Sequence, residues 1–331
     1  MNQSYSMSSE RPLPQPPPKR GKPLTDGQIG FLLVLPALIL FLVIILYPLL
    51  SSMYMAFLDK SLVFPGEKFV AFKNIEKAMR REFVPLLGTT MLFTLGATLL
   101  PFIIGFGVAL VLNGRIIGRG LLRGMFLLPW LIPSVVVSFL WMWIFNANYG
   151  VLNGVLRSLG LISQNINFLG DKSTAMWAVI IAKTWNSFPW IAVMILAGLQ
   201  TIPKELYEAA AIDGANRHKS FWNVTVPQLY GVIGTVLLLS FIWNFQHLET
   251  IYVMTSGGPG EATTTFAVSV YKAAFQSRDL GEAGAIGLLW MGLLSLVVLV
   301  YLRFGVQEAA ARPLFKHCIT TQRWSQAHRA V

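Results

Sequence analysis

The sequence predicts an all-α, polytopic membrane protein with six transmembrane helices, and both its composition and its hydropathy pattern indicate this fold class. Apolar residues make up 54% of the 331-residue chain and charged residues only 12%, whereas about a quarter of a soluble domain is charged. Roughly 20 consecutive apolar residues span a bilayer core as a helix. Six stretches meet this condition, at residues 29–54, 86–113, 121–145, 174–200, 228–248 and 283–303.

Residues 29–303 are therefore expected to form one transmembrane domain between two tails, 1–28 and 304–331. The first tail is rich in Pro, Ser and Gln, which predicts a disordered segment. A cleaved secretory signal is the alternative, but the apolar run from Phe31 is longer than a signal core. The short connection from Gly114 to Gly120 predicts that the second and third spans form an antiparallel hairpin.

Lysine and arginine residues indicate which ends of the spans face the cytoplasm. With the N-terminus inside, 15 of the 26 basic residues lie in inside segments and 10 in outside loops, while Lys183 lies within a span. The outside cations alternate with acidic residues, so the net charge is about +9 inside and about +1 outside. Both termini are therefore predicted to be cytoplasmic.

Several function classes are excluded by what the sequence lacks. The single cysteine, Cys318, cannot form an internal disulfide, and the histidines show no metal-ligand spacing. The net charge of +11 comes mainly from basic residues in the inside segments, and so does not indicate nucleic-acid binding. No G-x-x-x-x-G-K-[ST] sequence is present, so the usual phosphate-binding loop for ATP is missing. We expect a non-catalytic chain that binds no cofactor, metal or nucleic acid.

The inside loop at 201–227 predicts a short helix that begins near Pro203. Proline suits the first helical turn, and Glu205 and Glu208 lie near the positive end of the helix dipole. Three alanines, 209–211, allow another surface to approach closely. Gly214 can adopt the left-handed conformation that ends a helix.

A second helix is predicted to open at Ser220, with Pro227 marking the return into the fifth span. On physical grounds alone the loop is either a docking element for a cytoplasmic partner or an ordinary connection between helices.

The spacing in this loop resembles the EAA motif of permease subunits in binding-protein-dependent ABC importers. The matching residues are Glu208, Ala209, Ala210, Gly214 and Val224-Thr225-Val226-Pro227. Many members of the family end the motif in Ile-x-Leu-Pro, so the two valines are a conservative departure. Three further segments resemble the sugar-importer branch, of the maltose-permease type: Phe69 to Asn74, Leu127 to Pro129 and Ile251 to Gly260.

This resemblance implies the type I ABC importer permease fold, a bacterial inner-membrane location and a set of partners. The partners are a second homologous permease subunit, two ATP-binding cassette ATPase subunits that bind ATP and Mg, an extracytoplasmic solute-binding protein, and the surrounding membrane lipid. The residues implied to couple the chain to the ATPases are Glu205, Glu208, Ala209, Ala210, Gly214 and Pro227.

Two polar stripes within the spans predict the path of the solute. Polar groups in spans tend to face a bundle interior or an aqueous path, and each stripe has the spacing of one helical face. The fourth span contributes Lys183, Asn186, Ser187 and Trp190, and the fifth contributes Ser240, Trp243, Asn244 and His247. Amide, hydroxyl and aromatic groups together suit sugars, although the same groups also join helices to one another.

The charge of Lys183 bears on whether the solute is neutral or anionic. A lysine inside a span is costly unless it is paired or hydrated, so anionic sugars such as uronate oligosaccharides or sugar phosphates stand beside neutral sugars as candidate substrates. A stand-alone secondary transporter is the alternative function. The predicted spans have no Asp or Glu in their interiors, which counts against proton coupling.

Overall fold

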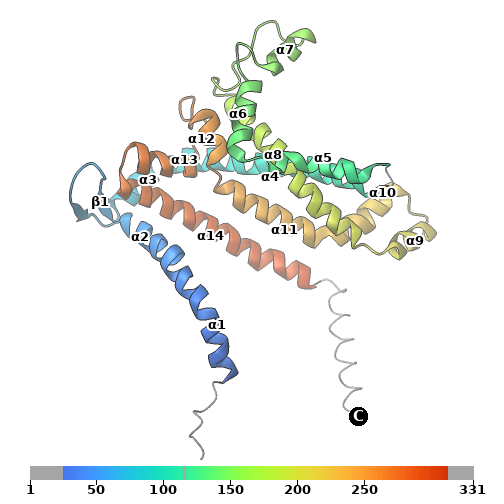
Figure 1. Ribbon diagram of the computed structural model, residues 1–331, viewed down its shortest axis with the longest axis horizontal. Coiled ribbons are helices and arrows are strands. Elements are labelled where there is room, and N and C mark those ends of the chain that lie inside the picture. Colours follow the sequence, from blue (N-terminus) through green and yellow to red (C-terminus); the bar gives the residue numbers. More distant parts are fainter. Residues whose placement is uncertain (1–24, 115–116, 312–331) are drawn as a thin grey trace, which may run out of the picture. The chain divides into compact units, whose positions relative to one another are not determined.

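The structure is a computed structural model that describes residues 25–114 and 117–311 (Figure 1). The chain divides into two units, Met1–Ser51 and Ser52–Val331, and each is described by itself. Most of the predicted tails, 1–28 and 304–331, lies outside the described residues.

The first unit contains the first predicted span. Helix α1 (Asp26–Phe41) begins after Thr25, whose backbone N–H donates a hydrogen bond of 3.0 Å to the side-chain oxygen of Gln28. One π-helical turn, η1 (Leu42–Leu46), leads into α2 (Tyr47–Met55). The apolar helix Asp26–Met55 is long enough to cross a membrane, which agrees with the predicted span at 29–54.

The second unit is also almost entirely helical. It contains β1 (Leu58–Lys60), β2 (Glu67–Phe69), α3 (Lys73–Arg81), α4 (Phe83–Asn113), α5 (Arg119–Leu131), α6 (Ser134–Ile144), α7 (Val151–Ser158), α8 (Ala175–Gln200), α9 (Lys204–Ile212), α10 (Arg217–Ser220), η2 (Phe221–Thr225), α11 (Val226–Phe245), α12 (Glu249–Thr255), α13 (Phe266–Tyr271), η3 (Lys272–Gln276) and α14 (Leu280–Ala311). The strands pair as a small antiparallel hairpin.

Helices α4, α8 and α11 form the centre of this unit (Figure 1). The largest helix pairing is that of α4 with α8. One cluster of buried side chains, which includes Phe93 and Ile180, lies near the start of α8, and a second, which includes Ile195 and Leu229, lies near its end. Small residues allow the close contact, because Gly105 of α4 lies directly against the backbone of α8.

The third predicted span, 121–145, is not one straight helix, and this is a correction to the expected pattern. Helices α5 and α6 meet at an angle of 92°. Pro133 fixes the chain direction here, since it lacks an N–H and biases the preceding residue away from helical geometry. Ile132 is accordingly extended, with φ −80° and ψ 129°.

The six predicted spans are otherwise confirmed as apolar helices. In the described ranges five helices are individually long and apolar enough to cross a membrane, and the bent pair of α5 and α6 supplies the sixth. The prediction of an all-α membrane fold is confirmed.

The fifth span begins earlier than predicted. Its helix starts at Arg217, where the side chain of Asn216 accepts a hydrogen bond from the Lys219 N–H, and it continues through the π-helical turn η2 into α11. Ser220 therefore does not open the helix, and Pro227 lies within a continuous helix. Proline is tolerated there because it is at the start of α11, next to a π turn that changes the hydrogen-bond pattern.

The contact between α4 and α8 gives a stability prediction. A Cβ atom at Gly105 would lie 2.7 Å from the carbonyl oxygen of Phe188 and 3.0 Å from the Ile191 side chain, whereas one at Gly107 would contact nothing within 4 Å. We expect Gly105→Ala to destabilise the protein by about 1–3 kcal/mol through overpacking. Gly107→Ala, on the same helix, should be neutral or slightly stabilising.

Thermal unfolding of both variants in the same detergent measures this difference. Equal melting temperatures for the two variants would contradict the close contact of α4 with α8.

Candidate functional site

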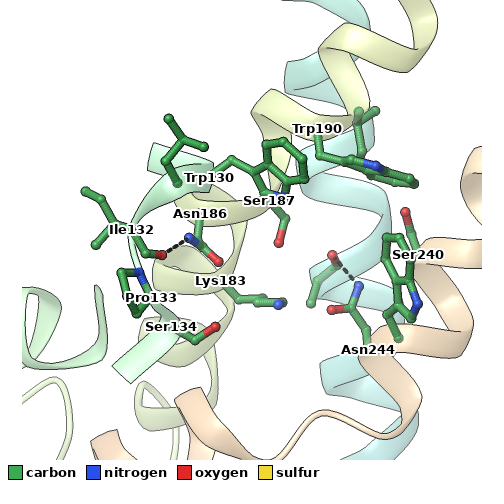
Figure 2. Close-up of a pocket in the computed structure, with 14 residues that line it drawn as sticks. Trp130, Ile132, Pro133, Ser134, Lys183, Asn186, Ser187, Trp190, Ser240 and Asn244 are labelled. Carbon is green, nitrogen blue, oxygen red and sulfur yellow. Dashed lines mark hydrogen bonds between the residues drawn. The ribbon is translucent and has the colours of Figure 1, made fainter. Parts of the chain in front are cut away.

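A polar cavity of about 330 Å³ lies between α5, α6, α8, α4 and α11. Figure 2 shows its lining side chains, which come from segments far apart in the sequence. The lining contains all the predicted path residues except His247: Lys183, Asn186, Ser187, Trp190, Ser240, Trp243 and Asn244. The two predicted stripes therefore face one space.

Asn244 is held in the cavity wall by a backbone group that a proline leaves unpaired. In a helix the carbonyl of residue 97 would accept from the N–H of residue 101, but Pro101 has none. The amide nitrogen of Asn244 donates to the Ala97 carbonyl at 2.8 Å and to Thr98 Oγ1 at 3.2 Å. The buried amide thus ties α11 to α4.

Asn186 plays the same part at the bend between α5 and α6. Pro133 cannot donate to the carbonyl of Pro129, and the Asn186 amide nitrogen donates to that carbonyl at 2.8 Å and to the Ile132 carbonyl at 3.3 Å (Figure 2). The side-chain oxygens of Asn186 and Asn244 point into the cavity. Each asparagine therefore satisfies the backbone with its nitrogen and presents an acceptor to the cavity.

Aromatic and hydroxyl groups complete the lining. The rings of Trp190 and Trp243 are 4.9 Å apart between centroids and tilted by 59°. The Trp243 side chain is half exposed, as is that of Trp130. The buried Ser240 hydroxyl has no hydrogen-bond partner in the described part of the chain. The cavity thus offers apolar ring faces beside hydrogen-bonding groups.

Lys183 extends from α8 into the middle of this cavity (Figure 2). Within residues 25–114 and 117–311 it takes part in no ion pair. The acidic residue whose charge acts on it is Glu249, at the start of α12. Lys183 therefore faces the cavity with the charge of Glu249 acting on it from beyond ion-pair distance.

His247 does not belong to the cavity lining, in contrast to the prediction. Helix α11 ends at Phe245, so the helical spacing that places Ser240 and Asn244 on one face does not extend to residue 247. The imidazole instead lies 2.8 Å from Thr250 Oγ1 and stacks on the Phe93 ring.

The segment 130–134 is the part of the lining that the stripes did not predict. It reaches the cavity because the chain bends there. The two prolines at 129 and 133 were the available signal, but prolines in spans have several structural uses.

The loop at 201–227 has the predicted helix and turn. Helix α9 follows Pro203, and its side chains Glu205, Glu208 and Ala209 are exposed. Gly214 has φ +77°. The Ala215 N–H donates to the Ala210 carbonyl and the Gly214 N–H to the Ala211 carbonyl, which is the Schellman pattern of a helix end.

One contact in this loop was not predicted. The hydroxyl oxygens of Tyr207 and Thr225 are 3.0 Å apart and hydrogen-bonded. They join α9 to the π turn that precedes α11, so the short helix is fixed to the helix that carries Ser240 and Asn244.

Residues 102–315 match the family described as binding-protein-dependent transport system inner membrane component. This stretch covers α5, α6, α8 and α11 of the cavity, the second part of α4, and the 201–227 loop. The chain belongs to this family. As a member of the family it is an inner membrane component of a transport system, and the predicted resemblance to permease subunits of binding-protein-dependent importers is confirmed.

Two relatives cover most of the chain. The trehalose/maltose transport system permease protein MalF of Thermococcus litoralis is 34% identical over 85% of this chain and 94% of its own length. The sulfoquinovosyl glycerol transport system permease protein SmoG of Agrobacterium fabrum is 35% identical over 85% of this chain and 91% of its own length.

A solved structure supports the fold of this transport component. A chain of a bacterial ABC transporter involved in the import of the acidic polysaccharide alginate superposes with a TM-score of 0.71 at 21% identity, over 84% of this chain and 95% of that chain. At this identity the likeness concerns the fold.

The link between Asn244 and Pro101 gives a testable coupling. Asn244→Leu leaves the Ala97 carbonyl without its donor, which should destabilise the protein by about 1–3 kcal/mol. Pro101→Ala restores a backbone N–H for that carbonyl, so the same leucine should cost about 1 kcal/mol less in the Pro101→Ala background.

Denaturant unfolding of the single and double variants in micelles gives the coupling energy. Asn186→Leu is the matched control, because its carbonyl partners lie at the α5–α6 bend. Strict additivity of Asn244→Leu with Pro101→Ala would show that the bond does not replace the missing donor.

Proposed function

We propose that this chain is one of two permease subunits of an ATP-driven importer for a sugar or oligosaccharide. The observation that carries the proposal is the single cavity lined by both polar stripes, with three tryptophans beside two amide oxygens and three serines. Aromatic faces pack on the C–H faces of a sugar ring, while amide and hydroxyl groups bind its hydroxyls. The relatives named for trehalose/maltose and for sulfoquinovosyl glycerol transport support this solute class.

Membership of the family supports a set of further subunits in this proposal. An extracytoplasmic binding protein would deliver the solute, and a second permease would complete the path. Two ATPase subunits, which would bind ATP and Mg, would dock on α9. The exposed Glu205, Glu208 and Ala209 offer an acidic surface with a small residue beside it for this docking. This assembly requires 201–227 and both termini to be cytoplasmic, in agreement with the charge distribution.

The proposed assembly is favoured over the alternative function, a stand-alone secondary transporter. The family match spans the EAA loop, which has no use in a carrier that works alone. In the proposed mechanism, ATPase closure moves α9, and the motion passes through α11 to the cavity as a rigid-body change.

The coupling role of 201–227 is tested at Gly214. Any side chain with a Cβ is strained at its φ of +77°, so Gly214→Val should distort the end of α9. Because coupling between sites is typically worth 1–3 kcal/mol, we expect binding-protein-stimulated ATPase activity and uptake to fall by roughly fivefold or more.

Gly160→Val is the matched control, since Gly160 has φ +69° and open space around it but lies in the loop between α7 and α8. The assay uses the assembled complex in proteoliposomes. If both variants retain the same stimulated ATPase activity, the loop does not couple the chain to the ATPases.

A second, finer proposal concerns the charge of the solute. Lys183 places a cation in the cavity without an ion-pair partner in the described ranges, which favours an anionic sugar such as a uronate oligosaccharide or a sugar phosphate. Loss of a charge-assisted hydrogen bond of about 1.5–3 kcal/mol would reduce transport of such a solute by roughly tenfold or more.

Lys183→Gln should therefore reduce uptake of anionic sugars and leave uptake of neutral sugars nearly unchanged. Lys172→Gln, at an exposed lysine of the loop before α8, is the control. Uptake is measured in proteoliposomes with matched pairs of neutral and anionic saccharides. An equal effect on both members of each pair would rule out selection by the Lys183 charge.

A further inference from the structure

A second cation lies in a separate groove, between α5 and α8. Arg123 is in the second turn of α5, and its Nε and one terminal guanidinium nitrogen are buried without a hydrogen-bond partner in the part of the chain that the structure describes. The groove has a volume of about 260 Å³. Apart from Arg123 and Gln200, its lining is apolar, and it includes Phe126, Leu127, Val193 and Leu196.

This groove is distinct from the solute cavity. On α8 the groove is lined by residues 189, 192, 193, 196, 197 and 200, whereas the cavity is lined by 183, 186, 187, 190 and 191. At 100° per residue the mean directions of these two sets are about a third of a turn apart. The two sets have no residue in common.

The groove lies at the end of α8 that leads into the 201–227 loop. Gln200 is the last residue of α8, and α9 begins at Lys204. Arg123 is near the start of α5, so both polar lining residues are at the same end of their spans. This is the depth at which lipid headgroups meet the hydrocarbon core.

The neighbouring surface of α5 is apolar and exposed. Leu121, Met125 and Leu128 have exposed fractions of 73%, 58% and 57%, which suits contact with acyl chains. A guanidinium with two nitrogens buried among apolar side chains and without a hydrogen-bond partner is stabilised by an anion. Its planar set of donors fits phosphate oxygens in a bidentate way.

We propose that the groove between α5 and α8 binds an anionic phospholipid of the leaflet on the side of the 201–227 loop. The phosphate accepts hydrogen bonds from Arg123, and one acyl chain lies along Phe126, Leu127, Val193 and Leu196. Basic pockets between membrane helices bind anionic headgroups in this way. The site does not depend on which solute the cavity carries.

The test is performed on the assembled complex, purified in detergent and supplied with equal amounts of phosphatidylglycerol and phosphatidylcholine. Native mass spectrometry counts the retained lipids. The wild type should retain phosphatidylglycerol preferentially, and Arg123→Gln should bind it about tenfold more weakly, as expected for a lost charge-assisted hydrogen bond. Arg123→Lys should keep part of the preference because it keeps the charge.

Arg303→Gln is the matched control, since Arg303 is an exposed arginine at the C-terminal end of the last candidate span, on α14, and does not line the groove. It should retain phosphatidylglycerol at the wild-type level. Equal retention by the wild type, Arg123→Gln and Arg303→Gln would overturn the proposal.

A second measurement needs no variant. Phosphatidylglycerol with a photoreactive acyl chain should label wild-type peptides that contain Phe126, Leu127, Val193 or Leu196. Labelling only elsewhere would overturn the proposal.

Discussion

Every backbone polar group inside a membrane needs a partner within the protein, and proline removes one donor from the helix that contains it. Two prolines, Pro101 and Pro133, create this problem at the centre of the chain. Asn244 and Asn186 solve it by donating to the carbonyls of Ala97 and Pro129. The same bonds attach α11 to α4 and α8 to the bend between α5 and α6, and they fix where the amide oxygens point.

The polar surface of the cavity is therefore a consequence of how the helices are joined. A relative movement of α11 and α4 that broke the bond from Asn244 to Ala97 would rotate the amide and change the cavity wall. A rigid-body change between two arrangements of these helices would then also change the cavity that is proposed to hold the solute. The link between helix movement and the cavity wall therefore needs no further chain of interacting residues.

The two helices that supply the asparagines also flank the loop at 201–227. Helix α8 ends at Gln200, shortly before α9, and α11 continues without interruption from Arg217. The hydrogen bond between Tyr207 and Thr225 fixes α9 to the base of the second of these helices. The left-handed Gly214 turns the chain between them without a steric cost. A displacement of α9 would therefore move α11, whose far end lines the cavity.

The sequence was sufficient to predict the positions of helical faces, because residues three or four apart in a helix share a face whatever surrounds them. Lys183, Asn186 and Trp190 meet Ser240, Trp243 and Asn244 for this reason. The same rule failed at His247, where the helix had already ended at Phe245. The bend at Ile132 could not be predicted from the sequence. A proline in a span can kink a helix slightly or break it, and the outcome depends on whether another helix satisfies the freed carbonyl.

Lys183 in the cavity and Arg123 in the groove differ in their chemistry, and each side chain suits its surroundings. Lysine is a compact, strongly hydrated charge on a flexible stem, whereas arginine offers a rigid fork that matches phosphate. A solute site must release its ligand, and in the proposed function the ammonium of Lys183 would give a reversible interaction with an anionic solute. Arg123 lies instead in an apolar groove at the end of its span, where the proposed lipid would satisfy the guanidinium. On this proposal the face of α8 that meets the solute carries the lysine, and the face that meets the lipid carries the arginine.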